Sequence, residues 1–170
     1  MGTTERAAAF DRLVSGGLAR WYRIAASLLG DATEAEDAVH DAAVTAWQQF
    51  ASLRDHAAFE AWFDRILVNG CRDRLRRRRF GSVVDVAAVL EGRADGADLA
   101  RDAADRDALR GAMRVLDPDH LVVVVLRYES DLTVPAIAAR LGIAEGTVKS
   151  RLHHALRRLR AELDRTGGGR

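Results

Sequence analysis

The chain has 170 residues, and its 26 Lys and Arg against 25 Asp and Glu give a formal net charge of +1. This length suits one medium domain or two small ones, and so balanced a charge does not by itself indicate a nucleic-acid binder. The single cysteine excludes an internal disulfide and a four-cysteine zinc site. Residues 1–10 lack the apolar run of a signal peptide, and residues 121–126, the longest apolar run, are far too few to span a membrane, so we expect a soluble, cytoplasmic protein without membrane insertion.

Residues 1–80 form a first block, in which apolar residues recur at helical spacing. Gly30 is placed to end the first helical stretch. Thr33 followed by Glu36 is a capping-box pattern, which predicts that a second helix begins near Thr33 and continues to about Phe50.

A third helix of the first block is predicted after a loop at residues 51–56. It begins near Ala57, carries Trp62 and Phe63 on an apolar stripe that we assign to the core, and ends in the arginine run 72–79. Six arginines in these eight residues favour a nucleic-acid surface. The alternative is a solvated helix end whose cations complement the helix dipole.

The composition changes after the arginine run. Acidic residues and interspersed glycines predict a flexible acidic linker at residues 81–104, followed by a second block at residues 105–165 and a disordered tail at residues 166–170. Within the second block, Asp117 and Pro118 are typical of a helix start.

The segment that begins at Thr133 reads as a helix, a turn and a second helix. Thr133 is predicted to cap the first helix, Gly142 to end it in a left-handed conformation, and Glu145 to begin the second. We therefore predict an all-α fold of two small helical domains joined by the linker, the second with a helix-turn-helix. In such motifs the start of the second helix meets base edges in the major groove, although similar helix pairs also occur in proteins that do not bind DNA.

Two strings carry a resemblance to a known family. LTVPAIAARLGIAEGTVKSRLHHALRRLRAEL resembles region 4 of the extracytoplasmic-function (ECF) sigma factors, and LLGDATEAEDAVHDAAVTAW followed by FEAWFDRILVNGCRDRLRRRR resembles their region 2. The resemblance implies an alternative sigma factor that directs RNA polymerase to promoters by reading −10 and −35 elements. It further implies three partners, which are the clamp helices and flap of core polymerase, promoter DNA and an anti-sigma factor.

The resemblance also implies site residues. The expected contacts with −35 DNA are Thr147, Lys149, Ser150, Arg151, His153, His154 and Arg157. The expected contacts with the −10 strand are Arg54, His56, Asn69, Arg72, Arg76 and Arg77. The expected contacts with core polymerase are Glu36, Asp37, His40, Asp41, Thr45 and Trp47. Two arginines common in the family are replaced by His154 and Leu156, which predicts fewer phosphate contacts and a weaker dependence of binding on salt.

Other chemistry finds little support in the sequence. The five histidines and Cys71 show no metal-ligand spacing, and there is no phosphate-binding glycine loop or nucleophile motif, so we expect neither a cofactor nor an enzyme. Two alternatives remain. A stand-alone helix-turn-helix regulator would leave residues 36–47 without a role, and a helical adaptor that does not bind DNA would leave the arginine run unexplained.

Overall fold

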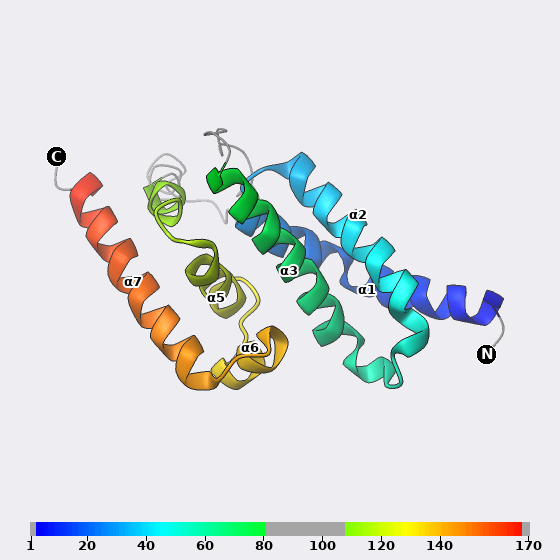
Figure 1. The fold of residues 1–170 in the computed structure, drawn as a ribbon. Coiled ribbons are helices and arrows are strands. Elements are labelled where there is room, and N and C mark those ends of the chain that lie inside the picture. Colours follow the sequence, from blue (N-terminus) through cyan, green and yellow to red (C-terminus); the bar gives the residue numbers. More distant parts are fainter. Residues whose placement is uncertain (1–2, 81–107, 168–170) are drawn as a thin grey trace, which may run out of the picture. The chain divides into compact units, whose positions relative to one another are not determined.

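The computed structural model describes residues 3–80 and 108–167. They belong to two compact units, residues 1–87 and residues 88–170 (Figure 1). The regular elements in the described residues are all helices, which confirms the predicted all-α class. The predicted linker at residues 81–104 lies outside the described residues.

Three helices that pack on one another form the first unit. Two short 3-10 turns occupy half of the predicted loop at residues 51–56 and extend beyond it at both ends. The elements are α1 (Thr3–Leu29), α2 (Ala32–Gln49), η1 (Phe50–Ser52), η2 (His56–Ala58) and α3 (Phe59–Phe80). Trp21 of α1 stacks on Phe63 of α3 with ring centroids 3.9 Å apart, and both side chains are fully buried. Phe63 thus lies in the core as predicted, whereas Trp62 is only half-buried.

The turn between α1 and α2 shows which local signals decide a helix boundary. Gly30 ends α1 with a φ of 70°, a left-handed conformation that glycine adopts at little cost. The cap predicted at Thr33 is wrong, because Asp31 caps α2 by accepting a hydrogen bond from the backbone N–H of Glu34 at 2.8 Å. Asp31 lies two residues earlier, so Thr33 falls inside the first helical turn.

The second unit contains the helical residues 108–113 and three longer helices, which are α5 (Pro118–Tyr128), α6 (Val134–Leu141) and α7 (Glu145–Gly167). Asp117 caps α5 by accepting from the backbone N–H of His120 at 3.0 Å, as predicted. Because α5 packs against both α6 and α7, its whole apolar run from Leu121 to Leu126 is buried. Helix α7 continues to Gly167, so the tail predicted to begin at residue 166 is wrong for its first two residues, and residues 168–170 lie outside the described part.

Candidate nucleic-acid interface

The helix-turn-helix of the second unit is formed by α6 and α7. Thr133 caps α6 by accepting from the backbone N–H of Ala136 at 3.4 Å, and Gly142 ends it with φ 65° and ψ 37°. Both caps were predicted. Ile137 of α6 and Val148 of α7 are fully buried, which fixes the first turns of α7 against α6. The side of α7 opposite this core is therefore the side presented to solvent.

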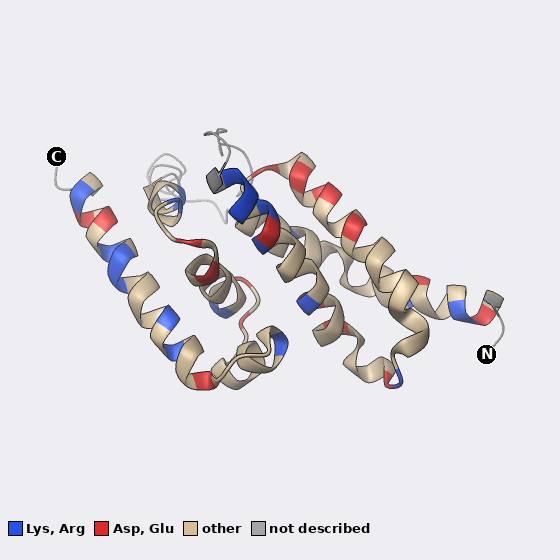
Figure 2. Ribbon diagram, viewed as in Figure 1, with Lys and Arg blue, Asp and Glu red and all other residues tan. Residues whose placement is uncertain are grey.

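Most of the residues expected to contact −35 DNA share the solvent side of α7. Six of these side chains are exposed, namely Thr147, Lys149, Ser150, His153, His154 and Arg157. The seventh, Arg151, is half-buried. Ser150, His153 and Arg157 follow one another at spacings of three and four residues, which places them along one line of the helix. Figure 2 shows basic residues recurring along α7. This side can offer short polar donors and cations to a base edge or a phosphate.

Acidic residues at the start of α5 lie against one flank of α7. Arg151 Nη2 is 3.5 Å from Asp119 Oδ2, and Arg158 Nη1 is 3.6 Å from Asp117 Oδ2. The rings of His120 and His154 meet edge to face, with centroids 6.3 Å apart. The sequence did not predict these contacts, because they depend on how α5 packs against α7.

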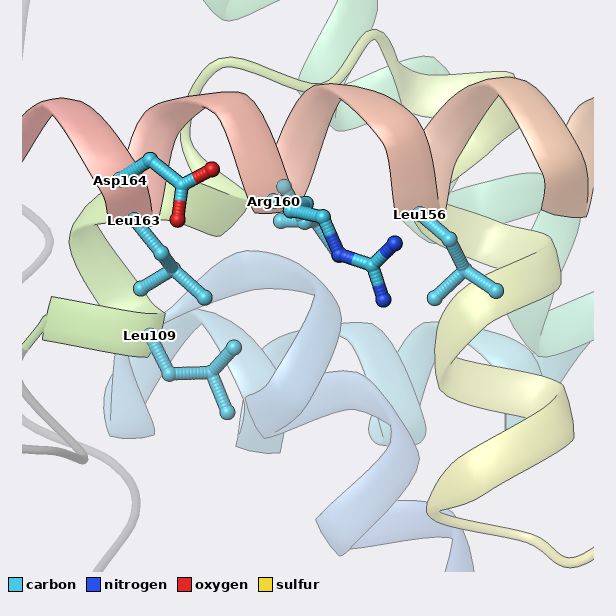
Figure 3. Close-up of a pocket in the computed structure, with 6 residues that line it drawn as sticks. Leu109, Leu156, Arg160, Leu163 and Asp164 are labelled. Carbon is cyan, nitrogen blue, oxygen red and sulfur yellow. The ribbon is translucent and has the colours of Figure 1, made fainter.

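Leu156 lines an apolar groove on the second unit (Figure 3). Leu109 and Leu163 face each other across it, and the buried Leu159 also lines it. Arg160 and Asp164 complete the lining. Leu156 thus adds apolar surface at a position where the resemblance noted in the sequence implies an arginine.

In the first unit, the arginine run at the end of α3 is partly paired with acids of α2. Arg74 forms an ion pair with Asp41. Arg78 forms an ion pair with Glu34 and donates to the backbone carbonyl of Leu29 at 2.8 Å. These two arginines therefore hold α3 against the first helices, in addition to contributing to the basic end of α3 that Figure 2 shows.

The residues expected to contact the −10 strand lie before the start of α3 and between its middle and its C-terminal end. Arg76 and Arg77 are exposed near its C-terminal end, and the half-buried Arg72 donates to Asn69 Oδ1 at 3.1 Å. Before its N-terminal end, Arg54 and His56 are exposed, and the His56 ring stacks on the buried Phe50 with centroids 5.0 Å apart. The structure thus separates these residues into two groups along α3.

The residues expected to contact core polymerase lie on α2. Four of them are exposed, namely Glu36, Asp37, His40 and Asp41, whereas Thr45 is half-buried. Trp47 is half-buried because it packs edge to face on Phe10, at 5.2 Å between centroids, with the guanidinium of Arg6 over its ring. Trp47 therefore contributes to the contact between α1 and α2 as well as to the surface.

A groove between α1 and α2 was not predicted from the sequence. Glu36 and His40 line it together with Leu18, Ala19, Tyr22, Val39 and Ala43. Leu18 is 48% exposed, so that part of its apolar side chain faces solvent beside the groove. Leu18 borders the acidic part of α2 only because α1 packs against α2, which the sequence does not show.

A buried ionic network fixes α1 against α3. Asp64 is fully buried, and among the described residues it is the one buried charged side chain. Its carboxylate accepts two hydrogen bonds from Arg20, at 2.9 and 2.6 Å, and one from Trp21 Nε1 at 2.8 Å. These three hydrogen bonds offset the cost of removing the carboxylate from water, and they fix the orientation of α3 against α1.

Burial also governs the one cysteine. Cys71 lies inside α3 with no exposed surface, and desolvation raises the pKa of its thiol to about 12. It is therefore a small core residue, as expected of a buried cysteine on a helix. In residues 3–80 and 108–167, no group of three His, Cys, Asp or Glu side chains is arranged to hold a metal ion. No described helix combines the length and apolar character needed to cross a membrane.

Family models match the two units in order. Residues 13–80 match Sigma-70 region 2, and residues 112–161 match Sigma-70, region 4. Among curated relatives, the chain is 37% identical over 150 residues to the ECF RNA polymerase sigma factor SigL of Mycobacterium tuberculosis, covering 86% of this chain and 84% of SigL. It is 32% identical over 155 residues to the RNA polymerase sigma-E factor of Streptomyces antibioticus, covering 91% and 84%.

Two solved structures resemble the fold over most of the chain. One is the sigma factor RpoE in complex with the anti-sigma factor NepR from Bartonella quintana, with a TM-score of 0.70, 27% identity and coverage of 91% of this chain and 96% of that one. The other is CnrH in complex with the cytosolic domain of CnrY, with a TM-score of 0.68, 27% identity and 94% of each chain covered. Sequence relatives, both region models and the fold agree, and the chain belongs to the ECF family of RNA polymerase sigma factors.

Proposed function

We propose that this protein is an alternative sigma factor that binds core RNA polymerase and directs it to promoters with particular −10 and −35 elements. The observation that carries the proposal is the solvent side of α7, where short polar and cationic residues follow a buried helix-turn-helix core. Such a surface suits major-groove readout, and the region 4 match falls on the same residues. We assign −35 contacts to the exposed residues Thr147, Lys149, Ser150, His153, His154 and Arg157, together with Arg151.

The first unit supplies the other two contacts of the proposal. The basic end of α3, with Arg72, Arg76 and Arg77, suits the phosphates of a melted strand, while Asn69, Arg54 and His56 are candidates for base contacts. The acidic face of α2 suits a basic partner, which we assign to the clamp helices of core polymerase. In this assignment Asp41 serves both α3 and the polymerase, since it already pairs with Arg74. The flap of the polymerase is assigned to the second unit.

The two parts act together. Each unit binds one promoter element, and attachment of both units to polymerase raises the effective concentration of the second contact once the first has formed. The protein thus works by binding, in the cytoplasm, with no chemistry of its own. Because RpoE was solved in complex with the anti-sigma factor NepR, we also assign an anti-sigma protein as the inhibitor of this one.

A gel-shift assay tests the proposal. Labelled promoter DNA, enriched from genomic fragments by the protein together with core polymerase, is mixed with the protein alone, with core alone and with both. The proposal predicts a specific shift only with both. A specific shift with the protein alone would instead indicate a stand-alone regulator, and no enrichment in any combination would indicate an adaptor that does not bind DNA.

A further inference from the structure

The flank of α7 that faces α5 carries two arginines, and each of them meets an acid. Arg151 and Arg158 are seven residues apart, nearly two helical turns, so they lie on the same side of the helix. Asp119 and Asp117 approach them at 3.5 and 3.6 Å. Asp119 lies in the first turn of α5 and Asp117 is its N-cap, so the start of α5 lies beside α7.

The acids are themselves held in place. Asp117 accepts the backbone N–H of His120 and also contacts the His120 ring, so it is fixed to the start of α5. Pro118 is buried, and the apolar run that follows anchors this start in the core. The side chains of Arg151 and Asp119 are only 25% and 28% exposed. Neither partner of this pair is therefore a freely moving surface side chain.

An arginine whose guanidinium is restricted in its motion is well suited to reading a DNA base. Its guanidinium carries five N–H donors in a rigid plane, so contact with one carboxylate oxygen leaves donors for a base or phosphate. Readout of a base by arginine requires two hydrogen bonds in fixed geometry. A side chain already held near that geometry loses less conformational entropy on binding.

We propose that Asp119 is a positioning residue for promoter readout, which holds the guanidinium of Arg151 in the orientation that reads a base of the −35 element. The inference rests on the proposed function and extends it. Asp119 improves discrimination between sequences and not affinity in general, because its negative charge repels every phosphate backbone alike. Removing the charge should weaken binding to the correct sequence while leaving binding to other sequences unchanged or tighter.

Holoenzyme assembled from core polymerase and the full chain provides the test. The probes are a duplex enriched from random-sequence DNA by wild-type holoenzyme and a scrambled duplex of the same base composition. In Asp119→Asn, the ratio of the two affinities should fall by about fivefold to tenfold, the loss expected when one arginine contact is no longer pre-oriented. Asp119→Glu keeps the charge and should restore most of that ratio.

Asp131→Asn is the matched control. It removes the same charge from the same unit, at a fully exposed side chain whose Oδ1 lies 3.9 Å from Arg127 Nη1. Its φ of 53° is one that asparagine also adopts readily. The ratio should therefore stay at its wild-type value.

Three results would overturn the inference. An unchanged ratio in Asp119→Asn would show that Arg151 is not positioned by this acid, while the sigma function would stand. A parallel loss of affinity for both duplexes, together with a lower melting temperature, would show that Asp119 only supports the fold. If wild-type holoenzyme enriches no duplex at all, the proposed function fails and the inference fails with it.

Discussion

Two adjacent glycines in α1 offer the sharpest test of the packing. A Cβ added at Gly16 would meet no atom within 4 Å, whereas one added at Gly17 would lie 2.4 Å from Cη2 of Trp21 and 2.6 Å from two other ring atoms. The Trp21 ring has little freedom to move away. It is fully buried, it stacks on Phe63, and its Nε1 donates to Asp64.

The free energies of unfolding of the two alanine variants should therefore change in opposite directions. Either replacement gains about 1 kcal/mol from helix propensity. At position 17, displacing the ring costs about 2 kcal/mol of overpacking strain, and leaving the buried hydrogen bond of Trp21 unmade costs about 2 kcal/mol more. Gly16→Ala should thus stabilise the first unit by about 1 kcal/mol, and Gly17→Ala should destabilise it by about 3 kcal/mol.

Guanidinium unfolding of the full chain, followed by circular dichroism, measures both values. Each unit is fitted with its own transition, because two compact units need not unfold together. The transition of the second unit serves as the internal control and should not move. If Gly17→Ala stabilises the first unit as much as Gly16→Ala does, the close approach of the Trp21 ring to this glycine is wrong.

Three further predictions follow from single side chains. Burial raises the pKa of the Cys71 thiol from 9.0 to about 12, so alkylation of this thiol should be slow in the folded chain and fast in guanidinium. The free energy of unfolding should fall as the pH rises above about 9, because the thiol ionises in the unfolded chain before it does so in the folded one. Fast alkylation of the folded chain would contradict this. Asp64→Asn places an amide NH2 group, itself a donor, against the N–H donors of Arg20 or Trp21. It should lower the free energy of unfolding of the first unit by about 3 kcal/mol in the same assay, and no change would disprove the network. Arg157→Ala should lower the slope of log affinity against log salt by about 1 for any duplex, and Arg165→Ala, at an arginine paired with Glu162, should not.

Much of the second unit could be predicted because its signals are local. Asp117, Thr133 and Gly142 each act on a backbone group within a few residues, so the sequence around them contains the whole interaction. The recurrence of apolar residues at helical spacing after Glu145 likewise indicates which side of α7 is buried. The error at Thr33 has the same local nature, since a competing acid two residues earlier provides the better-placed oxygen.

The features that sequence did not predict depend on pairs of helices. The arginine run gives no sign that Arg74 and Arg78 pair with acids of α2, because those acids are more than thirty residues away. Asp64 appears in the sequence as an ordinary charge on a helix, and only the packing of α1 against α3 brings its three donors to it. The pairing of Arg151 with Asp119 has the same origin.

The sequence departures from the family also acquire a physical meaning in the structure. His154 lies on the solvent side of α7, where a histidine ring presents fewer N–H donors than an arginine side chain does. Leu156 instead lines the apolar groove of Figure 3. The predicted weaker dependence of binding on salt rests on both positions, of which only His154 has a polar side chain.

Run-off transcription tests the central claim most directly. Purified core polymerase is supplied with fragmented genomic DNA from the source of the chain, with and without the full-length protein, and the transcript starts are mapped. The account predicts new starts that require the protein and that share two upstream elements at a constant separation. A protein that binds core polymerase but adds no starts, or starts that share no upstream elements, would contradict it.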